Sequence, residues 1–391
     1  MDRPKQNQPA LPFALLASAC LGMFAASSSG TTRAPFLLDM ARDLSTDIAL
    51  VANLVAMTSV AWGVASMFAG AGSDRFGRRP FLLGGPIMLT VALIGVAQAE
   101  SFLTVAAWSI LAGGSSGTFT GVTFAEVSAR VEQGQRGRAL GWVMAGQSLT
   151  LLVGVPMAAW IGSFIGWRGV NLCVGGIAVA ALIGLAFTTS GQASSRRVAG
   201  TPAPSLRAAM SGPVLRLLAM GVCERVCYGL TAVYFATFLQ ETFVLSLAAV
   251  AIPLALFAAG NILGTIAGGQ IADRIPNRLR TFALSMLASG IVAIALFGWH
   301  PSVSVTVALG FLYVFVTAVA RPSLMAALTD VPEHIRGTVL GLNVTSASFG
   351  WLFAASLGGW MMGSYGFDGF GPLAAAFGVV GAGLAVVRRD R

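Results

Sequence analysis

Charged residues are scarce in this sequence. Asp, Glu, Lys and Arg make up 10% of its 391 residues, whereas soluble proteins of average composition carry about 25%. Hydrophobic residues make up 56% of the chain, and the mean hydropathy is +0.79. Because a soluble core of this size cannot bury so much apolar surface, we expect much of it to face lipid.

Lysine and histidine are almost absent, which excludes several classes of enzyme. Lys5 is the only lysine, so the chain has no phosphate-binding loop and cannot pump by hydrolysing ATP. His300 and His334 are expected in loops on opposite sides of a membrane, where they cannot build a catalytic triad or a zinc site. Glu126 and Glu224 lie in different halves of the chain, so they cannot act as a hydrolytic pair. We expect a protein that is not an enzyme and has no cofactor.

Cysteine is also rare, and all four cysteines lie in apolar runs: Cys20, Cys173, Cys223 and Cys227. In such surroundings they are expected to behave as small apolar residues and to form no disulfide framework. Cys223 and Cys227 are one helical turn apart, but no histidine or acidic cluster completes a metal site. We therefore expect no bound metal.

Long apolar runs are abundant. Runs of roughly 18–24 residues recur along the chain, and each can cross a hydrocarbon core of ~30 Å as a helix. The runs are continuous rather than alternating, which favours helices over a closed barrel. The fold class we predict is an all-α membrane protein with twelve transmembrane helices. The predicted spans are 12–34, 48–69, 81–99, 103–128, 139–162, 169–188, 214–237, 246–268, 281–299, 303–327, 338–360 and 371–387.

The distribution of basic residues predicts the orientation in the membrane. With a cytoplasmic N-terminus, all but five of the 24 Lys and Arg residues fall in cytoplasmic segments. Arg42 and Arg168 fall in outside loops, Arg33 lies at a helix end, and Arg225 and Arg321 lie inside spans. This bias follows the positive-inside rule and places both termini in the cytoplasm. The net charge of +9 is thereby explained without a nucleic-acid partner, and the first run is expected to be a helix rather than a signal peptide.

The chain divides into two similar halves. The Ser-, Gly- and Pro-rich segment "TSGQASSRRVAGTPAPSLRAAMSGP" breaks the apolar pattern, so we predict a six-helix bundle at 1–188, a cytoplasmic linker at 189–213 and a second six-helix bundle at 214–391. At an offset of about 200, "APFLLD" (34–39) matches "ATFLQE" (236–241) and "RGRALG" (136–141) matches "RGTVLG" (336–341). Such repeats place a substrate site at their interface, near the midplane.

Charge is concentrated in "GAGSDRFGRRP" at 70–80, and "GGQIADRIPNRLR" at 268–280 is a weaker copy. The pair resembles the G-x-x-x-D-R-x-G-R-R signature of the major facilitator superfamily, and the resemblance covers essentially the whole chain. It implies the major facilitator fold, with a loop that latches the cytoplasmic face in the outward-open state. The alternative is a basic loop that only sets topology. The latch residues are Gly70, Asp74, Arg75, Gly77, Arg78 and Arg79, with Asp273 and Arg274 in the copy.

A second resemblance lies in the fifth span, "GQSLTLLVGVPMAAWIG" at 146–162. It is similar to the antiporter signature of twelve-helix drug:proton antiporters (the sugar/drug efflux subfamily), in which Gly and Pro bend the helix. Gly146, Gly154 and Pro156 fit this signature, whereas Ala159 replaces its final glycine. The resemblance favours efflux over uptake. The alternative is that Gly154 and Pro156 merely kink a membrane helix.

The fourth span departs from that subfamily. Its members often carry an arginine four residues before a glycine, proposed to take part in proton transfer. Alignment on Gly113 places Ser109 there, so proton coupling would have to use other groups.

Four charged residues are expected at membrane depth: Glu126, Glu224, Arg225 and Arg321. Each costs about 2.5–3.5 kcal/mol to insert, so each needs a role. The resemblance implies that the first, fourth, seventh and tenth spans line a central cavity, and the last three of these spans carry the four residues. Glu126 has two possible partners that the sequence does not separate: Arg130 one turn along its own helix, or Arg321 across the two bundles.

Glu224 is our predicted proton carrier. It lies near the membrane midplane on a face that continues through Tyr228, and burial there disfavours the charged carboxylate. Two alternatives stay open: Arg225 holds Glu224 ionised in a purely structural pair, or Glu126 is the carrier.

Arg33 is expected to form an extracellular ion pair with Asp39 or Glu241. Polar and aromatic residues that could contact a substrate are Ser27, Ser28, Trp62, Phe119, Gln147, Tyr228, Asn261 and Asn343.

The function predicted from these features is secondary active transport by alternating access. We expect a monomer in the bacterial cytoplasmic (inner) membrane that exports small amphipathic molecules in exchange for protons. The alternative is uptake or exchange of a small metabolite or organic anion drawn by Arg225 and Arg321. A receptor or scaffold that keeps the fold without transport is disfavoured by the intramembrane acids.

Overall fold

The computed structural model describes residues 11–132, 135–189, 210–275 and 277–386, and all regular secondary structure in these ranges is helical. The predicted linker at 189–213 falls almost wholly outside the described residues. So do the side chains of Asp74 and His334. The predicted all-α fold class is confirmed.

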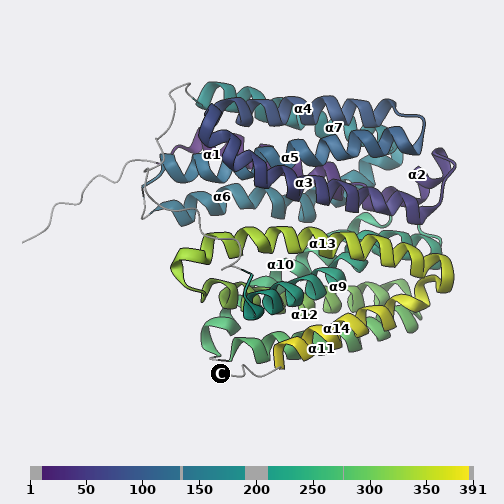
Figure 1. Cartoon of the computed structure of the whole chain (residues 1–391). Helices are drawn as coiled ribbons and strands as arrows, with labels where there is room; N and C mark the ends of the chain where they lie inside the picture. The colour runs from purple at the N-terminus through teal and green to yellow at the C-terminus, as the bar shows by residue number, and fades with distance from the viewer. Residues whose placement is uncertain (1–10, 133–134, 190–209, 276, 387–391) are drawn as a thin grey trace, which may run out of the picture.

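Two groups of helices lie one above the other in Figure 1. The first group is α1 (Phe13–Thr31), η1 (Ala34–Phe36), α2 (Leu37–Asp43), α3 (Ile48–Phe76), α4 (Arg79–Gln98), α5 (Phe102–Arg130), α6 (Arg136–Leu149), η3 (Thr150–Gly154) and α7 (Val155–Thr188). The second is α9 (Gly212–Phe243), α10 (Ala251–Arg274), α11 (Arg278–Gly298), α12 (Val303–Thr329), α13 (Glu333–Tyr365), η4 (Gly366–Gly369) and α14 (Phe370–Val386). We call them the first and second bundles.

Every predicted span lies on one of these helices. Nine helical segments in the described ranges are long and apolar enough to cross a membrane. Two of them, Arg136–Thr188 and Thr338–Val386, each contain two predicted spans. The chain turns within these segments at Gly166 (φ 68°) and Gly366 (φ 64°), backbone conformations that favour glycine. The remaining span is α5. The chain is a multi-pass membrane protein.

Glycines bring helix backbones together inside each bundle. In the first bundle Gly113 and Gly117 of α5 lie against the backbone of α3 at Thr58 and Trp62. In the second bundle the corresponding helices are α10, equivalent to α3, and α12, equivalent to α5. Here the glycine is on α10, because Gly264 lies against the backbone of α12. Small residues allow such close approach in membrane helices. The two halves thus use the same kind of contact with the glycine on opposite helices.

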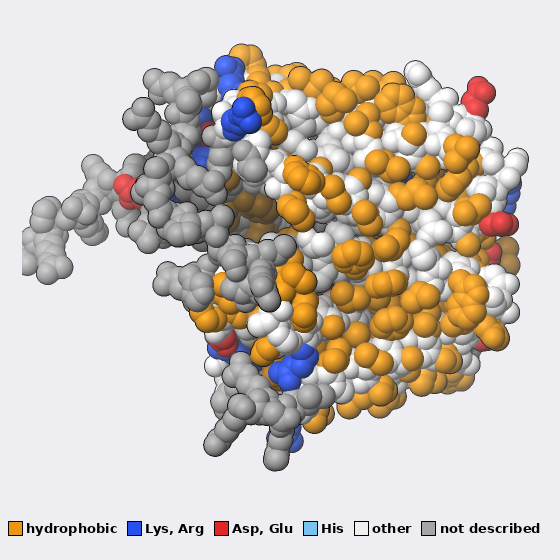
Figure 2. Space-filling model, in the orientation of Figure 1, with side chains coloured by type: hydrophobic (Ala, Val, Ile, Leu, Met, Phe, Trp, Pro, Cys, Tyr) orange, Lys and Arg blue, Asp and Glu red, His pale blue; other side chains and the backbone are white. Residues whose placement is uncertain are grey.

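The two ends of the molecule differ in charge. Figure 2 shows hydrophobic side chains along both bundles and arginines gathered at one end. We call this the arginine-rich end and define it by Arg75, Arg78, Arg79, Arg130, Arg136, Arg138, Arg274, Arg278 and Arg280. The opposite end carries α2 and is called the far end.

Candidate functional site

The two bundles touch each other at the far end. Gln240 of α9 donates from Nε2 to the carbonyl oxygen of Pro35 in η1 (3.1 Å), and Ser356 of α13 donates to Oδ1 of Asn53 in α3 (2.8 Å). These bonds join segments more than 200 residues apart in the sequence. They close the far end of the interface between the bundles.

A small apolar cavity lies between the bundles behind this closure. Its volume is about 40 Å³, whereas pockets for drug-sized ligands occupy about 300–1,000 Å³. A larger ligand can therefore bind only if the bundles move apart. The lining residues are Gly30, Thr31, Ala34, Val55, Leu151 and Val155 from the first bundle and Tyr228, Ala232, Val233, Leu254, Phe257, Ala258 and Trp351 from the second.

Glu224 lies next to this cavity in a buried ion-pair cluster. Its side chain in the middle of α9 is 2% exposed. Arg321 of α12 donates to Oε1 of Glu224 from both Nη2 (2.9 Å) and Nε (3.2 Å). Arg225 is 3.7 Å away through its Nε, and Asn261 accepts from Nη1 of Arg321 (3.5 Å). Two arginines this close favour the ionised carboxylate in the state seen here.

Tyr228 separates the charged cluster from the cavity. The guanidinium carbons of Arg321 and Arg225 lie 5.2 and 5.9 Å from the centre of its ring. On the cavity side the ring packs edge-on against Trp351 (5.7 Å) and stacks on Phe257 (6.3 Å). Cation–π attraction therefore couples the position of Tyr228 to the two arginines. Trp351 and Phe257 were not predicted, because nothing in their sequence surroundings distinguishes them from packing aromatics.

Glu126 is paired locally. Its carboxylate accepts from Arg130 one turn along α5, and Nη1 of Arg78 lies 3.5 Å from it and donates to the carbonyl oxygen of Ala125 (3.2 Å). Of the two partners that the sequence left open, the structure has Arg130, and it places Arg321 against Glu224 instead. The reason is depth, because Glu126 lies one turn from the arginine-rich end whereas Arg321 lies deeper in its bundle.

The second bundle repeats this contact. Nη1 of Arg278, at the start of α11, donates to Oδ2 of Asp330 at the end of α12 (2.6 Å). In the same way Nη1 of Arg78, at the start of α4, donates to the carbonyl oxygen of Ala125 near the end of α5. The offset of 200 between Arg78 and Arg278 is the sequence signal for this pair. Asp273 and Arg274, the predicted partners in the copy, are exposed at the end of α10.

The predicted latch residues surround the turn between α3 and α4. Gly77 has φ 86° and ψ 157°, a conformation that is essentially restricted to glycine. Arg75 lies over the ring of Phe76 (5.3 Å), and Arg79 is exposed. A methyl group at Gly70 would meet nothing within 4 Å, so no neighbouring described residue packs closely against Gly70 in this state.

Arg33 is not in an extracellular ion pair. It is 2% exposed, and Nη1 donates to Oγ1 of Thr58 (3.0 Å). Nε and Nη2 have no hydrogen-bond partner, and no carboxylate of the described chain lies within 4 Å. Asp39 pairs with Arg42 instead (3.7 Å). The prediction was wrong because η1 turns the chain at Pro35 and directs Arg33 into the first bundle.

The antiporter-like stretch contains a π-helical turn, η3, between α6 and α7. Thr150 at its start donates to the carbonyl oxygens of Phe24 and Gly146 (both 3.1 Å) and lies 3.5 Å from the hydroxyl of Ser28. Gly146 lies against the backbone of α1, and Pro156 follows in the first turn of α7. The predicted distortion of this span is therefore present at η3, which lines the cavity through Leu151.

The remaining substrate-contact candidates lie in different places, and only Tyr228 lines the cavity. Tyr228 lines the cavity, whereas Asn261 contacts the ion-pair cluster and Asn343 donates to the sulfur of Met325 (3.4 Å). Phe119 is 2% exposed and packs against α1 and α4 inside the first bundle, so its role is in the core. Ser27, Trp62 and Gln147 are partly buried and do not line the cavity.

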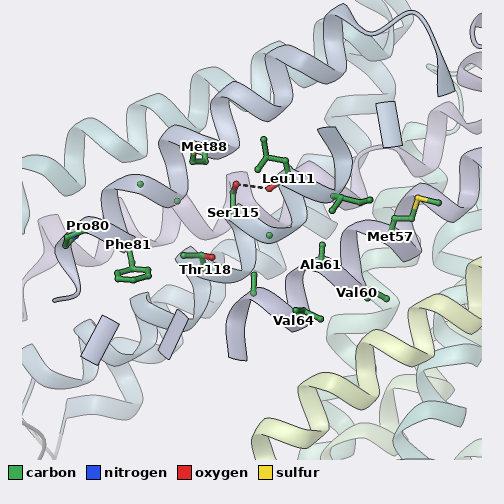
Figure 3. Close-up of a pocket in the computed structure, with 15 residues that line it drawn as sticks. Met57, Val60, Ala61, Val64, Pro80, Phe81, Met88, Leu111, Ser115 and Thr118 are labelled. Atoms are coloured by element: carbon green, nitrogen blue, oxygen red, sulfur yellow. Dashed lines mark hydrogen bonds between the residues drawn. The ribbon is translucent and has the colours of Figure 1, made fainter. Parts of the chain in front are cut away.

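A second depression of about 770 Å³ lies on the outer face of the first bundle, between α3, α4 and α5. Figure 3 shows its lining, which includes Met57, Val64, Phe81 and Met88. Its polar groups are few, and the hydroxyl of Ser115 is used by a bond to the carbonyl oxygen of Leu111 (2.7 Å). All of its lining residues belong to the first bundle, so it is not the site between the bundles.

Comparison with known proteins defines the class to which this arrangement belongs. The model of the Major Facilitator Superfamily matches residues 19–279 and 217–391. The chain belongs to the major facilitator superfamily, as the sequence signature predicted, and it is a transporter rather than an enzyme.

Among its relatives is an uncharacterized transporter of this superfamily, YwfA of Bacillus subtilis, which is 25% identical over 96% of this chain and 92% of its own length. A chloramphenicol resistance protein of Streptomyces lividans is 27% identical over 74% of each chain. The inner membrane transport protein YdhP of Escherichia coli is 27% identical over 79% of this chain and 78% of its own length.

Solved structures of the superfamily share the fold. A bacterial homologue of the human lysosomal transporter Spinster, in an inward-facing and unoccupied conformation, aligns with a TM-score of 0.78 over 97% of this chain and 95% of its own, at 15% identity. A D-xylose–proton symporter aligns with a TM-score of 0.80 over 97% and 98%, at 15% identity.

Proposed function

We propose that this protein exports small amphipathic compounds across the bacterial cytoplasmic membrane in exchange for protons. The observation that carries the proposal is the buried Glu224–Arg321 pair beside an apolar cavity between two bundles. A carboxylate at this depth can hold a proton when its arginine partner is removed. The similarity to a chloramphenicol resistance protein supports export over uptake.

The transport cycle that we propose uses the closed far end as one of two states. In this cycle the arginine-rich end faces the cytoplasm, in line with the positive-inside rule, so the state described here is closed to the outside. In this state Arg321 competes with the proton for Glu224, which favours release of the proton to the cytoplasm. In our proposal the opening of the far end is accompanied by a rearrangement inside the second bundle that separates Arg321 of α12 from Glu224 of α9. A proton from outside can then bind Glu224, and the substrate can leave.

Two features support the role of the loop between α3 and α4 in this cycle. Arg78 binds the end of α5, and the turn at Gly77 fixes its position. We propose that Asp74, at the end of α3, forms its latch contact only when the cytoplasmic side closes. The two bundles, at 1–188 and 214–391, then move relative to each other, joined by the linker at 189–213.

The test is transport by the purified chain in liposomes. Chloramphenicol, an uncharged amphipathic compound, and a panel of similar compounds are supplied outside liposomes with an acidic interior. We expect accumulation of at least one compound inside and its collapse on addition of a protonophore. Accumulation of the compounds that is unaffected by the protonophore would contradict proton coupling.

A further inference from the structure

Arg33 is a buried cation that the transport cycle above does not use. Its side chain lies behind the cavity wall of the first bundle, bound to Thr58, whereas Thr31 and Ala34, close to it in the chain, line that wall. Only Nη1 has a partner, Thr58, whose own hydroxyl proton goes to the carbonyl oxygen of Leu54 (2.7 Å). A guanidinium buried without a counter-ion exerts an unscreened positive potential on its surroundings.

The charge on the other wall has the same sign. Arg225 and Arg321 share a single carboxylate, Glu224, so this cluster carries one net positive charge in the state described. Together with Arg33, the charged side chains behind the two walls carry three positive charges and one negative charge. Like charges in a low-dielectric site repel each other strongly, and cavities lined by one sign of charge select the charge of their ligands.

The surface that a ligand would touch is nevertheless aromatic and uncharged. Tyr228, Phe257 and Trp351 form one wall, and the two arginines lie within 6 Å of the Tyr228 ring. Aromatic faces ordinarily attract organic cations. Here the arginines already interact with Tyr228, so its ring offers less to a cationic ligand.

We infer that the cavity between the bundles accepts uncharged aromatic compounds in preference to lipophilic cations of the same shape, and that Arg33 is the residue that sets this selectivity. The inference rests on the proposed function, since it names the substrate class of the same site. It also assigns a role to the one buried arginine without a carboxylate partner in the part of the chain that the structure describes.

The experiment measures binding by the detergent-solubilised full chain, which needs neither a gradient nor export. The probes are two 4-hydroxybiphenyls that carry at the far ring either a tert-butyl group or a trimethylammonium group, which have the same shape and differ in charge. Isothermal titration gives the ratio of their affinities, with protein-free micelles as the blank. We expect the wild-type protein to bind the uncharged probe at least tenfold more tightly than the cationic one.

Substitution then locates the origin of the selectivity. Arg33→Met is expected to reduce the ratio to within about threefold, whereas Arg33→Lys, which keeps the charge, retains it. Arg42→Met removes an exposed arginine from α2 at the far end of the molecule. It is expected to leave the ratio of affinities unchanged. If Arg33→Met does not fold, Arg33→Gln, which keeps a donor for Thr58, replaces it.

Three results would overturn the inference: equal affinities of the two probes in the wild-type protein, failure of the uncharged probe to bind, or an unchanged ratio after removal of the Arg33 charge. None of them depends on proton coupling. If the wild-type protein shows the charge selectivity but no pH-driven transport, the result would contradict the proposed function and leave this inference intact.

Discussion

At the residue scale, the two arginines beside Glu224 are not equivalent. Arg321 makes two hydrogen bonds to the carboxylate, whereas Arg225 approaches to 3.7 Å without one. Removal of one partner from a buried pair costs about 3–5 kcal/mol, because the other charge stays buried and uncompensated. Arg321→Met should therefore lower the melting temperature much more than Arg225→Met and abolish pH-driven transport. Equal effects of the two substitutions on the melting temperature and on transport would show that the hydrogen bonds from Arg321 contribute no more than the charge of Arg225.

The partner of Arg321 can be identified by double-mutant cycles on the free energy of unfolding. Glu224→Gln and Arg321→Met remove two sides of one contact, so we expect a coupling energy of about 1–3 kcal/mol. Glu126→Gln combined with Arg321→Met is the matched control, and its effects should add. The opposite pattern would favour a pair between Glu126 and Arg321.

Sequence alone could identify the charged residues at membrane depth but not how they pair. Glu224 and Arg321 are 97 positions apart on different helices, so their contact depends on the rotation of α9 against α12. The partner of Arg33 was predicted wrongly because the direction of its side chain depends on η1. The repeat partner of Pro35 in η1 is Thr237, which lies inside the continuous helix α9. Short-range pairs such as Glu126 with Arg130 follow from helical spacing and could be predicted from the sequence.

At the scale of the elements, the turn between α3 and α4 depends on Gly77. Its φ and ψ values are essentially restricted to glycine, and a side chain there costs about 1–3 kcal/mol. Gly77→Ala should displace Arg78 from the end of α5 and slow transport while the protein still inserts into membranes. Gly84→Ala in α4 is the matched control, because Gly84 is not a latch residue and a methyl group there meets nothing within 4 Å. Transport rates that fall equally in both variants would contradict this role of the turn.

The two copies of the loop are expected to differ in importance. The first has Gly77 and the complete arginine series, whereas the second has Pro276 and Asn277 in its turn. We expect Asp74→Asn to reduce the transport rate by about tenfold, the size of a typical coupling between conformational states. Asp273→Asn should change it by less than about twofold. Liposome transport at equal protein content measures both, and equal losses would contradict the distinction.

Helix positions were the most predictable feature of these elements, because hydrocarbon thickness fixes the length of an apolar run. The residues at which helices end were less predictable. Helix α3 continues from the predicted end at 69 to Phe76, because no residue before Gly77 interrupts it. The π-helical turn η3 could not be located from the sequence. Gly154 and Pro156 predict a distortion, but its form depends on the bonds that Thr150 makes to α1.

At the scale of the whole molecule, transport requires the far end to open. A Cβ atom at Gly359 of α13 would lie 2.8 Å from Cβ of Ala49 in α3, close enough for a disulfide between the bundles after small adjustment. In a background without the four native cysteines, Ala49→Cys with Gly359→Cys should cross-link on oxidation and stop transport. Reduction should restore it, and Ala49→Cys alone should be insensitive to oxidant. Full transport by the cross-linked protein would contradict movement at this interface.

The central claim is that Glu224 couples proton movement to transport, and its most direct test is Glu224→Gln in liposomes. The amide cannot lose a proton, so the variant should exchange labelled for unlabelled substrate across the membrane but fail to concentrate it when a pH gradient is imposed. The wild-type protein, tested in parallel, should do both. A Glu224→Gln protein that still accumulates substrate against its gradient in response to pH would contradict the account.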